Sequence, residues 1–226
     1  MKLALMFSGG KDSCLALQKT MRMHDIVCLV SIISKNQESY MFHVPNIGMT
    51  KLQANCIGLP IIQKFTEGKK EKELDDLKEA FIEAKEKYKI EGIVTGAIRS
   101  VYQSTRIQKI CRDLDLWCFN PLWLKDQIEL LKELLDNKYT VIISGVFAYP
   151  LNERFLGRII DKKIIGELET LGKKFKLNPA GEGGEIETTV LDAPFFKRKI
   201  EILDYKSSYN NNSGVFDISI AKAVKK

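Results

Sequence analysis

Short apolar runs alternate with amphipathic stretches along the first half of the chain. Residues 3–7 and 26–33 are continuous apolar runs, which is typical of strands buried on both faces of a parallel sheet. Residues 69–89 show the clearest helical pattern, because apolar side chains recur there at steps of three and four with charges between them. Weaker patterns predict further elements: strands at 61–62, 92–96 and 116–119, and helices at 12–23, 49–58 and 107–114. This alternation predicts an α/β fold, an open parallel sheet with right-handed crossovers and helices on both faces.

The order of the elements changes after Pro121. Helical patterns are now mixed with strand-like runs: helices at 126–137 and 152–175, strands at 139–148, 186–191 and 199–203, and a polar turn at 207–213. This order predicts a smaller α+β domain after the parallel sheet. We therefore expect two domains, residues 1–123 and residues 124–226.

Composition limits the class of protein. Of the 226 residues, 45% are hydrophobic, which suits folded domains, and the longest early apolar run is far short of the roughly 20 residues that span a bilayer. Five cysteines without a C-x-x-C pair, and two histidines, disfavour a disulfide scaffold and a zinc site and predict a reducing cytoplasm. The net charge of +6 suits an anionic partner, such as a nucleotide, RNA or an acidic protein face, or simply a solvated surface.

The hexapeptide SGGKDS lies between the first predicted strand and the first predicted helix, where open α/β sheets bind ligands. Its glycines allow an anion to approach the backbone, the helix N-terminus supplies N–H groups, and Lys11 adds a positive charge. Asp12 would repel phosphate unless a hard cation such as magnesium lies between them. The sequence is neither a Walker A loop nor G-x-G-x-x-G. We expect phosphate contacts from the whole hexapeptide: Ser8, Gly9, Gly10, Lys11, Asp12 and Ser13.

A second loop follows the strand predicted at 92–96 and opens a helix, so it should face the same edge of the sheet. Arg99 and Arg106 suit bidentate binding of phosphate or carboxylate, although Arg106 alone is equally consistent with a solvated helix residue. Ser100 and Gln103 offer neutral hydrogen bonds. This loop is therefore a second candidate part of the site.

Glycines alternate with three glutamates between residues 181 and 188. Glu185 and Glu187 are expected on the same side of the strand that follows, because side chains alternate along a strand. Paired acids suit metal binding, capture of an amine or ammonium, or acid–base catalysis, and the alternative is a solvated acidic turn. The accompanying glycines favour a functional loop, with Glu182 as its third acid.

Four motifs together resemble those of the diphthine–ammonia ligase family, within the PP-loop ATP pyrophosphatases: SGGKDS, GAIxSxYQxxR at 96–106, NPLW at 120–123 and GEGGExET at 181–188. SGGKDS marks only the superfamily, whereas GEGGExET is the most specific of the four. The resemblance extends to about residue 199, and His43 and Asn46 fit the same pattern. Thr189 departs from it, since a bulky apolar residue is common there.

The resemblance implies an adenine nucleotide alpha hydrolase-like fold and an archaeal-type cytoplasmic ligase that uses ATP and Mg²⁺. Diphthine on the translocation elongation factor would be activated as an acyl-adenylate and amidated by ammonium, with release of AMP and pyrophosphate. No membrane or nucleic acid is implied as a partner, and a homodimer is left open. The implied catalytic residues are Lys11, Asp12, Glu182, Glu185 and Glu187, with Asp12 also the metal ligand. In this superfamily the adenine lies against the ends of the second and fourth strands, here residues 30–33 and 96–97. The implied nucleotide contacts beyond the hexapeptide are Ser31, Ile33, Gly96 and Ala97, and the implied substrate contacts are His43, Asn46, Ser100, Gln103, Arg106, Gly183, Gly184 and Thr188.

Two other classes stay open. A tRNA-modifying PP-loop enzyme, such as a thiouridine or lysidine synthetase, would suit the basic surface. Thiolation usually needs cysteines in the crevice, however, and we expect Cys14, just past the hexapeptide, to be a core residue. A non-enzymatic nucleotide-binding module such as a universal stress protein shares the broad fold, so the fold alone does not decide. Release of pyrophosphate separates an enzyme from a sensor.

Overall fold

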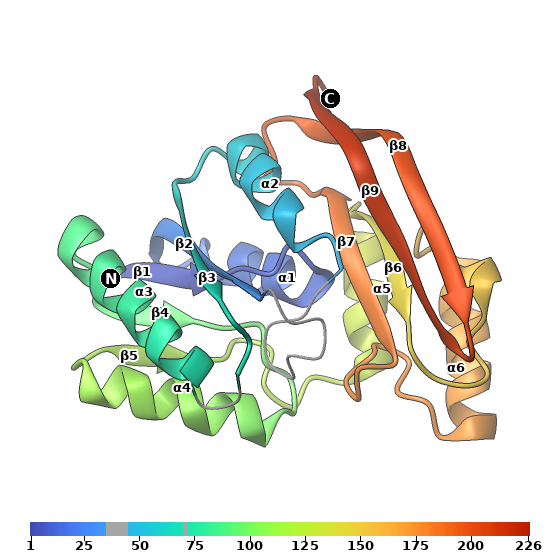
Figure 1. The fold of residues 1–226 in the computed structure, drawn as a ribbon, viewed down its shortest axis with the longest axis horizontal. Helices are drawn as coiled ribbons and strands as arrows, with labels where there is room; N and C mark the ends of the chain where they lie inside the picture. The colour runs from blue at the N-terminus through green and yellow to red at the C-terminus, as the bar shows by residue number, and fades with distance from the viewer. Residues whose placement is uncertain (35–44, 70–71) are drawn as a thin grey trace.

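The computed structural model describes residues 1–34, 45–69 and 72–226, which form two sheets lying side by side (Figure 1). The N-terminal sheet has five strands and the C-terminal sheet has four. Within the described ranges, no helix is both long enough and apolar enough to cross a membrane.

The first sheet is open and entirely parallel. Its strands are β1 (Lys2–Met6), β2 (Asp25–Ser34), β3 (Ile61–Thr66), β4 (Gly92–Val94) and β5 (Trp117–Phe119). They lie in the order β3-β2-β1-β4-β5, so the chain builds outward from β1 first on one side and then on the other. This change of direction places a crevice at the carboxyl ends of β1 and β4, where such sheets bind ligands.

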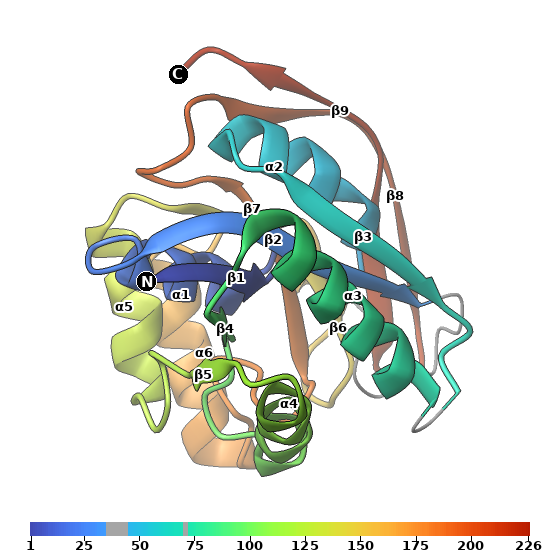
Figure 2. The same cartoon turned by 90° about the vertical axis from the view of Figure 1, so that its left-hand side faces the viewer.

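Helices cover both faces of this sheet (Figure 2). They are α1 (Lys11–Thr20), α2 (Thr50–Ile57) with the short turn η1 (Ile47–Met49) before it, α3 (Lys72–Tyr88) and α4 (Val101–Asp113). Leu3 and Leu5 pack with α1 and α2 on one face, whereas Ala4 packs with α3 and α4 on the other, because side chains alternate along β1. The predicted α/β fold is therefore confirmed.

The second sheet is antiparallel, in the order β7-β6-β9-β8. Its strands are β6 (Thr140–Val146), β7 (Ile186–Asp192), β8 (Lys199–Asn210) and β9 (Ser213–Val224), and its helices are α5 (Gln127–Asp136) and α6 (Lys162–Phe175). Asp126 caps α5 by accepting from the N–H groups of Ile128 and Glu129. This part is the predicted smaller α+β region.

Two predicted elements of the second half were wrong in extent. The helix predicted over 152–175 is interrupted: the turn η2 (Glu153–Phe155) comes first, and α6 begins only after Asp161, which caps it by accepting from Ile164 N at 2.8 Å. The polar turn predicted at 207–213 is in fact a tight hairpin turn at Asn211 and Asn212, both with positive φ. The strand predicted at 199–203 therefore continues to Asn210, and β9 follows it.

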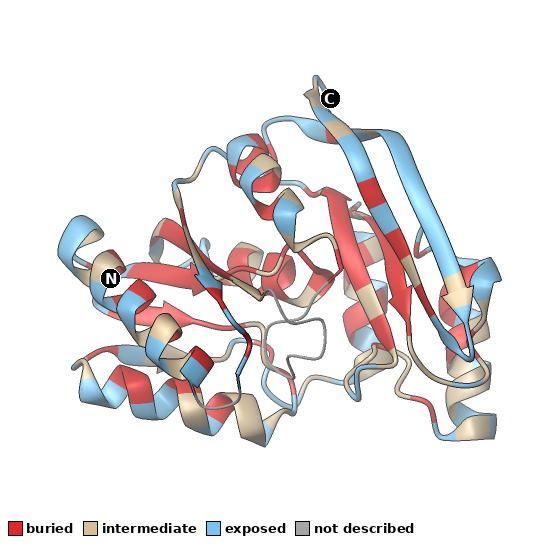
Figure 3. Cartoon of the chain, in the orientation of Figure 1, coloured by how far each residue is buried: buried red, intermediate tan, exposed pale blue. Residues whose placement is uncertain are grey.

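The two sheets share one hydrophobic core (Figure 3). Leu5 of β1 and Leu15 of α1 belong to the same buried cluster as Leu131 of α5, Val146 of β6 and Val190 of β7. Such a core is densely packed, so a displacement of one sheet would strain the other. The junction between the sheets is therefore a fixed surface on which a site can be built.

Candidate active site

A cavity of about 330 Å³ lies where the carboxyl ends of β1, β2 and β4 meet the glycine-rich loop before β7. The first sheet contributes the phosphate loop (residues 8–13), two side chains of β2 and the loop between β4 and α4, and the second contributes residues of the 181–187 segment. This volume lies within the range of small-molecule sites. Both sheets are therefore needed to enclose it.

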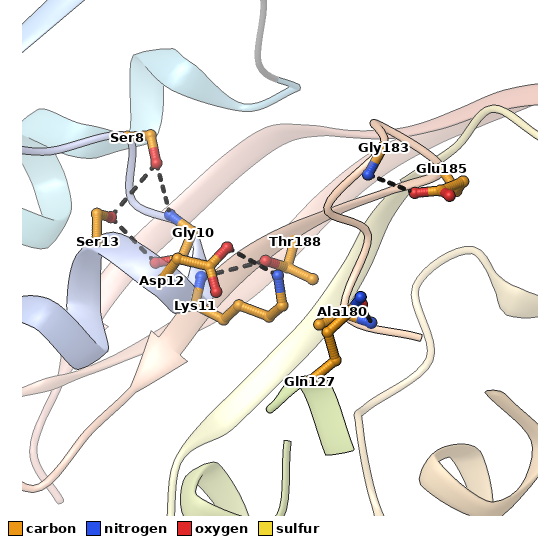
Figure 4. A network of polar contacts seen from close by, with 10 residues as sticks. All are labelled: Ser8, Gly10, Lys11, Asp12, Ser13, Gln127, Ala180, Gly183, Glu185 and Thr188. Carbon is orange, nitrogen blue, oxygen red and sulfur yellow. Dashed lines mark hydrogen bonds and ion pairs between the residues drawn. The ribbon is translucent and has the colours of Figure 1, made fainter. Parts of the chain in front are cut away.

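The phosphate loop turns sharply between β1 and α1. Gly9 has a φ of +76°, a conformation that favours glycine. Ser8 Oγ donates to Ser13 Oγ at 3.3 Å and accepts from Gly10 N–H at 3.4 Å, while Ser13 Oγ donates to Gly10 O at 3.1 Å (Figure 4). Ser8, Asp12 and Ser13 line the cavity, whereas Gly9, Gly10 and Lys11 are buried behind them.

The phosphate loop is hydrogen-bonded directly to the second sheet. Val190 N–H donates to Gly9 O at 3.0 Å. Lys11 N–H donates to Thr188 Oγ1 at 3.1 Å, the bond drawn in Figure 4. Thr188, expected to contact the substrate, is buried and lies outside the lining found among the described residues. Its observed contact anchors the phosphate loop to β7.

One lysine and three carboxylates gather at the cavity. Lys11 Nζ pairs with Asp12 Oδ2 at 2.8 Å. Burial lowers the pKa of Lys11, but the charges of Asp12, Glu182 and Glu187 outweigh this and raise it above its ordinary value, so the lysine stays charged. Burial, with repulsion from Asp12, raises the pKa of Glu182 to about 7. Burial also raises the pKa of Glu187 to about 7, with Lys11 opposing and the neighbouring acids adding to the rise.

Asp12 offers one carboxylate oxygen to a ligand. Its Oδ1 is buried and has no hydrogen-bond partner among the residues described, whereas Oδ2 is held by Lys11. Magnesium is typically bound through one or two carboxylates and the phosphates of its substrate, so this oxygen fits the ion. In the described ranges, no group of three or more His, Cys, Asp or Glu side chains is arranged as a metal site of its own.

Glu185 does not lie beside Glu187 as predicted. It precedes β7, and its carboxylate folds back onto its own turn, accepting from Asn178 Nδ2 at 2.6 Å, Gly183 N–H at 2.8 Å and Asn178 N–H at 3.1 Å (Figure 4 shows the Gly183 bond). Gln127 of α5 ties the same turn by donating to Asn178 Oδ1 and accepting from Ala180 N–H, each at 3.0 Å. Glu185 therefore shapes the turn that carries Glu182, and the expectation that it shares a face with Glu187 was wrong.

The loop between β4 and α4 closes another side of the cavity. Gly96 lies so close to α1 that a Cβ there would be 2.9 Å from the backbone at Asp12 and Ser13. Ser100 caps α4 by accepting from Gln103 N–H at 3.3 Å, and Ser100 and Gln103 line the cavity together with Gly96 and Ala97. These predicted residues are thus brought to the phosphate loop.

Several other predicted residues lie elsewhere. Ser31 and Ile33 point away from the lining, which contains Val30 and Ile32 instead. Arg106 stacks on the Tyr102 ring, with its guanidinium carbon 3.6 Å from the ring centroid, and is not among the lining residues described. Asn46 is hydrogen-bonded to β7 and β9: its Nδ2 donates to Thr189 Oγ1 and to the carbonyl of residue 216, and its Oδ1 accepts from the N–H of residue 218. His43 falls outside the described residues.

Part of the lining carried no signal in the sequence, namely Ile47, Thr95 and Ile107. Within the expected 30–33 segment, the residues that line the cavity are Val30 and Ile32. The strand β2 is buried on both faces, so its apolar run carried no signal for which face meets the cavity. None of the five cysteines is among the lining residues described, and burial raises the pKa of Cys14 above its ordinary value, which does not favour a reactive thiol.

The parallel sheet, the hexapeptide loop and the acid-lined cavity define an α/β protein with an anion-suited loop and carboxylates at one cavity. The diphthamide synthase N-terminal domain family matches residues 1–117, and the diphthamide synthase C-terminal domain family matches residues 126–224. The chain therefore belongs to the diphthamide synthase family, as the motifs predicted.

The curated relatives that the chain matches are named as diphthine–ammonia ligases, in agreement with this family. The diphthine–ammonia ligase of Bos taurus is 34% identical over 96% of this chain and 88% of its own length, and that of Homo sapiens is 34% identical over 88% of this chain and 82% of its own. The diphthine–ammonia ligase of Schizosaccharomyces pombe is 32% identical over 100% of this chain, which spans 40% of that longer protein. The prediction of an enzyme, a ligase forming a carbon–nitrogen bond, is confirmed.

A solved structure described as a predicted subunit of tRNA methyltransferase from Methanocaldococcus jannaschii covers 86% of this chain and 98% of its own. The two chains share 16% sequence identity, with a TM-score of 0.43.

Proposed function

We propose that the chain joins ammonium to the carboxylate of diphthine on the translocation elongation factor, through an acyl-adenylate, and releases AMP and pyrophosphate. The observation that carries the proposal is that one cavity joins the phosphate loop of the first sheet to Glu182 and Glu187 of the second. Amide formation needs an activated carboxylate, an amine and exclusion of water at the same place. Neither sheet provides all of these alone.

ATP would lie with its phosphates at Ser8, Ser13 and the first turn of α1, whose N–H groups and dipole favour anions. The adenine would lie against Val30 and Ile32 of β2 and the backbone of residues 96–97, where apolar side chains cover its faces. Magnesium would be held by Asp12 and the phosphates and would neutralise part of their charge. Lys11, paired with Asp12, would hold that carboxylate in place.

Glu182 and Glu187 would bind ammonium and take a proton from it. Ammonium is a cation, and a carboxylate with a pKa near 7 is both partly ionised and able to accept a proton at neutral pH. Glu187 is the more deeply buried of the two acids, and it lies opposite Gly145 on β6. We assign the binding of ammonium to both acids and the first proton transfer to Glu187.

The two chemical steps balance as follows. A carboxylate oxygen of diphthine attacks the α-phosphorus of ATP, and the bond to pyrophosphate breaks. Ammonium gives one proton to Glu187, the resulting ammonia attacks the acyl carbon, and the carbon–oxygen bond to AMP breaks as a second proton leaves. Amide, AMP and pyrophosphate are the products. Ser100, Gln103, Gly183 and Gly184 line the remaining wall and would contact diphthine.

These separate roles of the two sheets are consistent with a domain boundary near residues 121–126, between β5 and α5. Residues 1–123 would bind the nucleotide, and residues 124–226 would complete the acceptor side.

The test is incubation of the protein with ATP, magnesium, ammonium and an elongation factor that carries diphthine. Chromatography should find AMP and pyrophosphate, and mass spectrometry should find a hydroxyl of diphthine replaced by an amino group. ADP and phosphate as products, or an unchanged acceptor with full nucleotide turnover, would contradict the proposal. Omission of ammonium separates formation of the adenylate from its amidation.

A further inference from the structure

Gln53 of α2 lies between the phosphate loop and β7 and is fully buried. Its Nε2 donates to Gly9 O at 2.9 Å and to Val190 O at 2.8 Å. Two carbonyl acceptors require a donor at this place, which fixes the orientation of the amide. Its Oε1 has no hydrogen-bond partner among the described residues and lies where a side chain on Gly9 would begin.

These contacts determine how one peptide of the phosphate loop faces. Gly9 O and Gly10 N–H belong to the same planar peptide and point in opposite directions. Gly9 O accepts from Gln53 Nε2 and from Val190 N–H, and neither residue lines the cavity as described. Gly10 N–H consequently points the other way, towards Ser8 Oγ 3.4 Å away, and Ser8 lines the cavity.

We infer that Gln53 is a positioning residue that turns the Gly9–Gly10 peptide so that its N–H group meets the pyrophosphate end of ATP. This rests on the proposed function, since it assumes that ATP binds at the phosphate loop. Without Gln53, one of the two donors to Gly9 O is lost, Val190 N–H alone holds the carbonyl, and the peptide rotates more readily towards the anion. A carbonyl oxygen facing phosphate repels it, whereas an N–H group attracts it.

The composition of α2 supports a specific role. Thr50, Ala54 and Ile57 share the buried face of α2 with Gln53. An apolar side chain in place of Gln53 would leave no unpaired oxygen there, whereas Gln53 Oε1 has no partner among the described residues. A buried polar group with one unsatisfied atom costs stability and calls for an explanation. The orientation of the loop peptide provides one.

The test compares Gln53→Met with the wild-type protein by isothermal titration calorimetry, using ATP and AMP with magnesium as probes. Methionine keeps the length of the side chain and removes the donor. We expect ATP to bind about tenfold more weakly, which corresponds to about 1.4 kcal/mol, and AMP to bind as in the wild type. The control is Gln63→Met, which removes a 3.0 Å hydrogen bond to Thr50 Oγ1 of α2 without touching the phosphate loop. It should leave both affinities unchanged.

Equal losses for ATP and AMP, or no loss for either, would overturn the inference while leaving the proposed function intact. A wild-type protein that binds no ATP would overturn the proposed function and this inference with it. A measurement on the wild type covers the case in which Gln53→Met does not fold. By amide hydrogen exchange, ATP should slow the Gly10 N–H and leave the Val190 N–H, already bonded, unchanged. An unaffected Gly10 N–H would refute the proposed orientation.

Discussion

Replacing Glu187 with Gln should give a protein that is more stable than the wild type but much slower in amidation. Glu187 lines the cavity, and no hydrogen bond to its carboxylate is found within the described part of the chain. Burial raises its pKa from 4.5 to about 7, so the native state disfavours the ionised form. Gln is neutral at every pH and has nearly the same shape. The substitution therefore removes the cost of a buried negative charge.

The sign and size of the effect follow from linkage. The native state holds this proton more tightly than the unfolded chain does, so its stabilising contribution is complete below pH 4.5 and is lost as the pH rises through 7. The difference between the two pKa values corresponds to about 3 kcal/mol in the free energy of unfolding. Contact with solvent in the cavity reduces this to about 2 kcal/mol. For a chain of this size, the expected rise in Tm at pH 8 is roughly 4–8 °C.

The assay is thermal unfolding followed by circular dichroism at pH 5 and pH 8. The Tm of Glu187→Gln should exceed that of the wild type at pH 8 and approach it at pH 5, while the amidation rate falls by about a hundredfold or more. Glu201→Gln is the matched control, because Glu201 is exposed and makes a surface pair with Lys222 at 3.3 Å. A Tm difference independent of pH, or a variant less stable than the wild type at pH 8, would refute the reasoning.

Three further substitutions test other parts of the cavity. Asp12→Asn should keep the fold and slow magnesium-dependent pyrophosphate release by about a hundredfold, and wild-type rates would contradict the metal contact. Gly96→Ala places a Cβ 2.9 Å from the α1 backbone, so calorimetry should find ATP affinity about tenfold lower, and unchanged affinity would contradict the close approach. Glu185→Gln turns an amide NH₂ towards N–H donors of its own turn, including Gly183. It should lower kcat for amidation more than ATP affinity, whereas equal losses would argue against a role confined to the turn.

The first half of the fold was predictable because its signals are strong and local. Buried parallel strands read as continuous apolar runs, and the amphipathic pattern of α3 could not belong to a strand. The hairpin of β8 and β9 was missed because many of its side chains are exposed, and its last polar residues have the composition of a loop. The helix predicted over 152–175 failed because nothing in its apolar pattern marks Asp161 as a start more strongly than earlier polar residues.

The candidate site was predictable where a motif is contiguous in sequence. The phosphate loop and the 181–187 segment were found because glycines and charged residues cluster there. Contacts made across the fold left no such trace: Gln53 reads as one polar residue in a helix, and its two acceptors belong to segments far away in sequence. Glu185 was misplaced because the period of two applies within a strand, and the turn before β7 follows its own hydrogen bonds.

The bonds between the phosphate loop and β7 have a consequence for synthesis of the chain on the ribosome. Thr188 and Val190, which fix the backbone of Lys11 and Gly9, are translated about 180 residues after the phosphate loop. A nascent chain that exposes the complete parallel sheet therefore still lacks the partners that shape its phosphate loop. ATP then meets a competent loop only after β7 has left the exit tunnel and docked, so a prematurely terminated chain would carry the motif without the nucleotide site.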